Sequence, residues 1–158
     1  MESLLRVGAA AINAGQPSVA AMLWRDLDED DGLTQLITGN RGTAVVIGDH
    51  TLSLGTQPQG DMVTVDGHIC SVEDLTLNEL IDGVEAIATE SGSLSHEIEG
   101  LDRLAASLSD ELSITRFRLL LEDVLFDPRA RPVAMDRLEQ WHSRHQRRDR
   151  DVEGLFDT

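Results

Sequence analysis

Two histidines and a cysteine are the side chains of this sequence most suited to chemistry. His50 and His68 occupy equivalent positions in two copies of a repeat, residues 45–54 and 63–72, and Cys70 follows closely. Imidazole and thiolate groups bind Zn²⁺ and also form nucleophile and base pairs. One alternative is therefore a small metal-dependent enzyme built on these three residues. The sequence assigns them no fourth ligand or orienting acid, and His-x-Cys is not a recurrent ligand spacing, so we expect no metal and no cofactor.

A second pair of histidines lies near the end of the chain. His142 and His145 share one face of a predicted helix, and Glu139 lies one turn before His142. The sequence places no third ligand in register, and seven arginines surround the pair in residues 129–158. We therefore expect an exposed, solvated helix here rather than a metal site.

The acidic run 26–32 resembles a calcium loop in its first three ligand positions. The resemblance ends at Asp31, which stands where the loop needs glycine, and at Ile37, which stands where the bidentate glutamate belongs. An acidic helix end followed by a turn is the better interpretation.

The charge balance limits the classes of partner. The chain has 29 acidic residues and 13 basic ones, all arginine, which gives a net charge of −16. Residues 1–128 carry 23 acids and six Arg, a net −17, whereas residues 129–158 carry six acids and seven Arg, a net +1. Such a surface repels nucleic acid and anionic membranes and favours protein partners or self-association.

Cysteine use and the first residues indicate the compartment. One cysteine excludes an internal disulfide, which argues against a secreted, disulfide-rich scaffold. The first six residues carry an acid where a secretory signal needs a basic region, and the apolar run 7–12 is too short to cross a bilayer. We expect a soluble cytoplasmic protein with no membrane partner.

The repeat predicts the sheet that positions the first histidine pair. Gly48-Asp49 and Asp66-Gly67 are turn pairs that accept positive φ, so each copy reads as a β-hairpin with a two-residue turn. Two tandem hairpins predict a four-stranded antiparallel meander over about 43–72. Strand alternation then places eight residues on one apolar face: Val45, Ile47, His50, Leu52, Val63, Val65, His68 and Cys70.

Helices flank this sheet in the prediction. Short N-terminal helices are expected over 3–14 and 17–27, with a turn or third helix over 33–37. Thr76 and Glu79 form a capping box, and the helix they begin should cover the sheet.

Beyond that helix, the sequence predicts apolar stripes suited to association. A seam with 4-3-4-3-4 spacing resembles a coiled coil: Leu94, Ile98, Leu101, Ala105, Leu108 and Leu112. A broader stripe follows over 114–125, in the same helix or a second one. A last helix runs from Pro132 to about Arg147, and residues 149–158 form a flexible tail with Leu155 and Phe156 among its few apolar anchors.

The sequence thus predicts one α+β domain over 1–148, with a helical part over about 76–147. We expect a non-catalytic protein–protein interaction or assembly component that binds a protein partner or a second copy. The residues expected at that contact are Leu94, Ile98, Leu101, Leu108, Leu112, Leu155 and Phe156. The alternatives are a viral or secretion-type structural or chaperone component, and the metal-dependent enzyme above.

Overall fold

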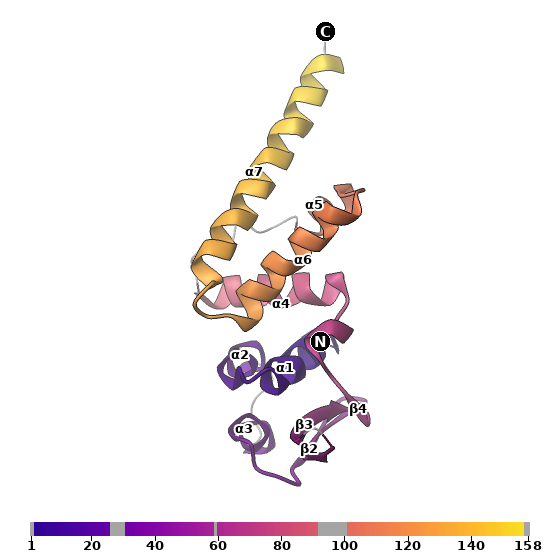
Figure 1. The fold of residues 1–158 in the computed structure, drawn as a ribbon, viewed down its shortest axis with the longest axis vertical. Helices are drawn as coiled ribbons and strands as arrows, with labels where there is room; N and C mark the ends of the chain where they lie inside the picture. The colour runs from indigo at the N-terminus through magenta and orange to yellow at the C-terminus, as the bar shows by residue number, and fades with distance from the viewer. Residues whose placement is uncertain (1, 26–30, 59, 92–100, 157–158) are drawn as a thin grey trace.

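The computed structural model describes residues 2–25, 31–58, 60–91 and 101–156, and confirms an α+β fold. Its helices are α1 (Glu2–Asn13), α2 (Pro17–Leu23), α3 (Asp31–Thr38), α4 (Leu77–Ser91), α5 (Leu101–Ser107), α6 (Glu111–Phe126) and α7 (Arg131–Phe156). The strands β1 (Ala44–Ile47), β2 (His50–Gln57), β3 (Gly60–Val65) and β4 (His68–Ile69) lie between α3 and α4, and the short 3₁₀ helix η2 (Val72–Asp74) follows them. The sheet lies at one end of the molecule and α7 extends from the other (Figure 1).

The sheet is the predicted meander. Its strand order is β1-β2-β3-β4, with every neighbouring pair antiparallel. The registers confirm that Ile47 pairs with His50 and Val65 with His68. Gly48 has a φ of +58°, and Asp66 and Gly67 have φ values of +53° and +85°, as two-residue hairpin turns require.

Strand β4 is short because a side chain takes the place of its next backbone pair. Asn13, at the end of α1, donates from Nδ2 to the carbonyl oxygens of Val63 (3.0 Å) and Cys70 (2.6 Å). Its Oδ1 accepts from the Val63 N–H (2.7 Å). A two-residue turn at Asp66-Gly67 would continue the ladder to a Val63–Cys70 pair, but the Asn13 carboxamide bridges these two residues instead and β4 ends at Ile69.

Helix α1 covers the sheet, a position that the sequence assigned to α4. It contacts β3 on one side and α2 and α4 on others, and α3 contacts β1. Because α1 is surrounded, its residues are buried on more than one face: Leu5, Val7, Ala9, Ala10 and Ala11 are fully buried. The prediction that α4 covers the sheet is wrong. The small residues of α1 allow α1 to lie between the sheet and α4.

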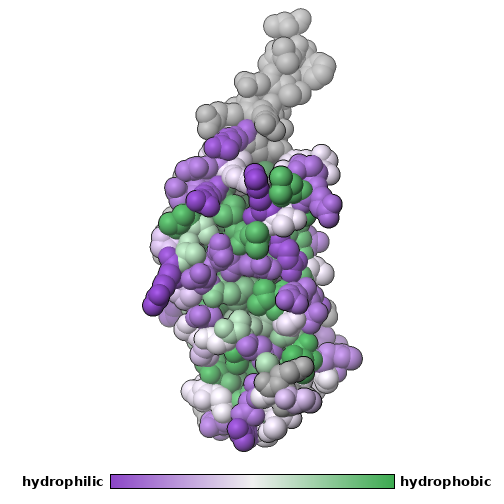
Figure 2. Space-filling model, viewed as in Figure 1, coloured by the Kyte–Doolittle hydropathy of each residue, from purple (hydrophilic) through white to green (hydrophobic). Residues whose placement is uncertain are grey.

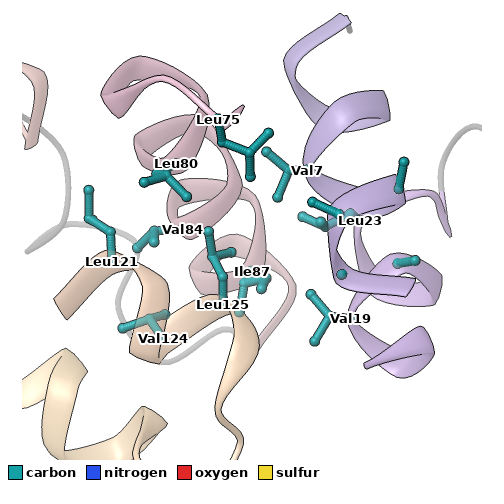
Figure 3. Close-up of a cluster of buried hydrophobic side chains, with 14 of the residues drawn as sticks. Val7, Val19, Leu23, Leu75, Leu80, Val84, Ile87, Leu121, Val124 and Leu125 are labelled. Atoms are coloured by element: carbon teal, nitrogen blue, oxygen red, sulfur yellow. The ribbon is translucent and has the colours of Figure 1, made fainter. Parts of the chain in front are cut away.

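Helix α4 instead joins the N-terminal part to the helical half. Figure 3 shows α4 between α1 and α2 on one side and α6 on the other, with aliphatic side chains meeting across both contacts. Among them, Leu80, Val84 and Leu125 are fully or almost fully buried. The predicted capping box at the start of α4 is confirmed: the Thr76 N–H donates to Glu79 Oε1 (2.8 Å) and the Glu79 N–H to Thr76 Oγ1 (3.2 Å).

A tryptophan fixes α2 against α1. Trp24 is fully buried, and its Nε1 donates to the Leu4 carbonyl oxygen at 2.9 Å. A Cβ built on Gly8 would lie 2.4 Å from Trp24 Cε2, so the indole ring occupies space that only glycine leaves free at this position.

The helical half consists of separate helices rather than one continuous rod. α5 ends at Ser107 and α6 begins at Glu111, capped by Asp110, whose carboxylate accepts from the Ser113 N–H at 2.9 Å. α7 continues to Phe156, past the predicted end near Arg147; its one proline, Pro132, lies in the first turn, where proline is tolerated. None of the described helices has both the length and the apolar character needed to cross a bilayer.

Candidate interaction surface

Of the first histidine pair, His50 takes part in the hydrogen bonds that link the two hairpins of the sheet. His50 Nδ1 lies 2.7 Å from Asp66 Oδ2, and the Thr51 N–H donates to Asp66 Oδ1 at 2.9 Å. These hydrogen bonds hold the pKa of the Asp66 carboxyl below its ordinary value, with His50 the larger cause. The Asp66 N–H also donates to the Thr51 carbonyl oxygen (2.8 Å), so this residue ties the second turn to the first hairpin.

The residues proposed for a metal site are not gathered into one. Cys70 is buried, and burial raises the pKa of its thiol, whereas His68 is exposed near the second turn. Within the described ranges, no three His, Cys, Asp or Glu side chains form a group that could hold a metal ion. His50 is partly buried on β2, with its ring nitrogen directed at Asp66.

The other two candidate sites are the second histidine pair and the acidic run 26–32. His142 is buried at 7 % exposure, so the predicted exposed position for this residue is wrong. The reason is that α7 packs against α6, and the stacked rings of Phe117 and Trp141, with centroids 6.1 Å apart, bring this stretch of the helix into the core. The side chain of His145 and the acidic loop 26–30 lie outside the described residues.

The predicted seam is divided among different environments. Leu94 and Ile98 lie outside the described residues. Leu101 is fully buried in the core of its own chain, and Leu108 is half-buried at the end of α5, where the seam breaks. Leu112, in contrast, is 60 % exposed on α6.

Exposed apolar side chains are concentrated on the helical half. Of the five large apolar residues exposed in the described part of the chain, Leu112, Ile114 and Leu119 lie on α6 and Val133 on α7. Leu112 and Leu119 are two helical turns apart and therefore share a face. We call these four residues the α6/α7 apolar surface; the fifth, Val46, lies on β1. On the face that Figure 2 shows, hydrophobic patches alternate with hydrophilic ones along the molecule.

A cleft of about 330 Å³ opens between the turn joining α5 to α6 and the middle of α7. Its apolar lining comes from Leu104, Leu108 and Trp141. Its polar lining comes from Ser107, Ser109, Asp110, Ser113 and Arg144. The apolar residues are buried or half-buried and most of the polar ones exposed, so most of the surface that the cleft offers to an occupant is polar.

The sequence reasoning missed this cleft although it carries a local signal. Ser107, Ser109 and Asp110 interrupt the heptad seam with residues that favour helix caps over helix interiors. Asp110 acts as such a cap, and its hydrogen bonds with Ser113 hold the pKa of the Asp110 carboxyl below its ordinary value. The break creates the turn, and the turn forms one wall of the cleft.

No family model, curated protein or solved structure matches this chain. Function is therefore argued from the residues and contacts above.

Proposed function

We propose that this protein is a non-catalytic assembly component that self-associates through its helical half. The observation that carries the proposal is the α6/α7 apolar surface, since four of the five exposed large apolar side chains of the described residues belong to it. Leu112 and Leu119 lie on one face of α6, and exposed apolar side chains grouped on one face of a protein mark sites of interaction. Their position on α6 agrees with the expected contact residue Leu112.

Charge supports a contact at this end of the molecule. The net charge of −17 over residues 1–128 opposes approach of two copies, and residues 129–158, at +1, are where that repulsion is weakest. Helix α6, which carries three of the exposed apolar residues, packs beside α7, the helix that belongs to this less acidic segment (Figure 1).

The test is the solution mass of the full chain across a concentration series, measured by sedimentation velocity. We expect the wild-type mass to rise with concentration, and Leu119→Arg to hold the protein at the mass of one chain. Val46→Arg is the matched control, because it places the same charge on an exposed apolar residue of β1, 71 % exposed against 52 % for Leu119. A wild-type chain that stays monomeric throughout, or a Leu119→Arg variant that assembles like wild type, contradicts the proposal.

A further inference from the structure

The side of α6 that faces away from the core carries a regular stripe of residues. Its five positions follow a 4-3-4-3 spacing along the helix: Leu112, Arg116, Leu119, Asp123 and Phe126. The buried residues of α6, such as Leu121 and Val124, lie on the opposite side of the helix. All five side chains of the stripe are exposed or half-buried, so the stripe is accessible to another molecule.

The stripe is self-complementary when its direction is reversed. Leu119 stands at the centre, with Arg116 about one turn before it and Asp123 about one turn after it. Two turns from the centre, both ends of the stripe are apolar, Leu112 on one side and Phe126 on the other. An antiparallel copy therefore places apolar residues opposite apolar ones and each positive charge opposite a negative one. A parallel copy would instead bring like charges together, which is unfavourable.

The two charges of the stripe are not paired within their own chain. Among the described residues, neither Arg116 nor Asp123 forms an ion pair, whereas the adjacent Arg118 pairs with Glu122 at 3.1 Å. Arg116 acts only weakly on Asp110, since the pKa of that carboxyl is lowered first by its hydrogen bonds with Ser113 and least by the charge of Arg116. Both charges are therefore available to a second copy.

We infer that two copies pair through α6 in an antiparallel arrangement about a two-fold axis at Leu119. This inference rests on the proposed self-association and specifies its contact. The same stripe serves on both copies, so Leu119 meets Leu119 of the second copy, and Arg116 of each copy lies opposite Asp123 of the other. The two reciprocal ion pairs supply a local attraction between chains that their net charge of −16 otherwise drives apart.

The first experiment exchanges the charges and measures the dissociation constant of the pair by sedimentation equilibrium. Arg116→Glu places like charges at both symmetric contacts and should raise the dissociation constant by about tenfold, and Asp123→Arg should do the same. An equal mixture of the two variants should pair with wild-type affinity. In that mixed pair the introduced glutamate faces the introduced arginine, and the native Arg116 of one chain faces the native Asp123 of the other.

The controls match each variant in net charge. Arg103→Glu on α5 makes the same change as Arg116→Glu, and Asp82→Arg on α4 makes the same change as Asp123→Arg, both at exposed positions outside α6. Each should leave the dissociation constant within about twofold of wild type. Circular dichroism of every variant checks that the helices remain folded.

The second experiment tests the register by oxidation to a disulfide. Leu119→Cys places a thiol on the two-fold axis and should cross-link two copies rapidly, since the native Cys70 is buried. Leu112→Cys is the matched control at a similarly exposed position of the same helix. In the inferred register it lies opposite residue 126, so the two introduced thiols are separated by about 21 Å along the helix. A disulfide needs Cα atoms within about 7 Å, so this variant should not cross-link.

Two results would overturn the antiparallel pairing while leaving self-association standing. One is a mixture of the two charge variants that assembles no better than either variant alone. The other is cross-linking of Leu112→Cys as fast as that of Leu119→Cys. A wild-type chain that stays monomeric at every concentration would overturn the pairing and the proposed function together.

Discussion

The carboxylate of Asp66, in the turn of the second hairpin, lies 2.7 Å from Nδ1 of His50, the first residue after the turn of the first hairpin. The same carboxylate accepts from the Thr51 N–H. Asp66, in the turn of the second copy of the repeat, therefore links the two copies. The two repeated histidines have different surroundings, since His50 is partly buried and His68 is exposed.

This link predicts a contribution of Asp66 to stability that depends on pH. The hydrogen bonds from His50 and the Thr51 N–H hold the folded-state pKa of Asp66 below the ordinary value of an aspartate carboxyl. Its contribution is therefore present above that value and is lost as the pH falls through the lower folded-state pKa. We expect the free energy of unfolding of wild type to exceed that of Asp66→Asn near neutral pH, with the difference shrinking in acid. Asparagine tolerates the positive φ of this position, so the change isolates the charge.

The measurement is urea denaturation of both proteins from pH 7 to the acid limit. Asp82→Asn, at an exposed position of α4, is the matched loss of a carboxyl group. A constant difference between wild type and Asp66→Asn at all pH values would show that the ionised carboxylate contributes nothing.

Gly8→Ala should destabilise the protein by about 1–3 kcal/mol, because its Cβ would lie within 2.6 Å of three indole atoms of Trp24. The indole ring of Trp24 has little freedom to move, since its Nε1 donates a hydrogen bond to the Leu4 carbonyl oxygen and the side chain is fully buried. Differential scanning calorimetry or urea denaturation measures the loss.

Gly83→Ala is the informative comparison for that variant. Its added Cβ would meet only the ends of Val7 and Leu125 side chains, at 3.0–3.3 Å. The gain of about 1 kcal/mol in helix propensity from glycine to alanine is common to both positions, since Gly8 lies within α1 and Gly83 within α4, so the comparison isolates the packing. We therefore expect Gly83→Ala to cost less than Gly8→Ala, and the reverse order would refute the packing described for Trp24.

Asn13→Ala should weaken the link between β3 at Val63 and the chain at Cys70, which the Asn13 side chain bridges. The change removes three hydrogen bonds to backbone groups and leaves part-buried partners unsatisfied, at a cost of about 2–4 kcal/mol. Amide hydrogen exchange at Val63, whose N–H donates to Asn13, should accelerate more than exchange elsewhere in the sheet. Asn40→Ala, at an exposed position, provides the control, and unchanged exchange at Val63 would contradict the structure.

Arg118 joins α6 to the segment before α4. Its Nη1 and Nη2 donate to the carbonyl oxygens of Leu75 (2.8 Å) and Val72 (3.0 Å). Lysine cannot reproduce this two-pronged geometry, so Arg118→Lys should lower the free energy of unfolding by about 1–2 kcal/mol. Arg116→Lys, at an exposed position two residues before Arg118, should change the free energy of unfolding little in the same urea titration.

Local patterns predicted local structure well. The hairpin turns, their registers and the capping box at Thr76 depend on residues close in sequence, and the structure confirms them. The position of α1 depends instead on how distant elements share its small residues, for which no short-range pattern exists. Asn13 meets Val63 across 50 positions and Cys70 across 57, so its role was invisible in the sequence.

The candidate site shows the same division. The spacing from 94 to 112 matches a heptad, but Asp110 caps α6 and breaks the helix there, so a strong local cap outweighed a weak periodic signal. The cleft needs α7 to pack beside that break, which depends on Phe117 and Trp141 meeting across two helices.

The Asn13 carboxamide has one more consequence, for how copies of this chain avoid joining in the wrong way. A sheet grows by adding a neighbour's strand along an outer strand that has unpaired backbone groups. Where β4 ends, at Ile69, the next outward-facing backbone groups of β3 are the N–H and carbonyl of Val63. Both are already hydrogen-bonded to the Asn13 side chain, so an incoming strand finds no free partner there. Amyloid-like stacking is disfavoured on this side, and orderly association is left to the helices.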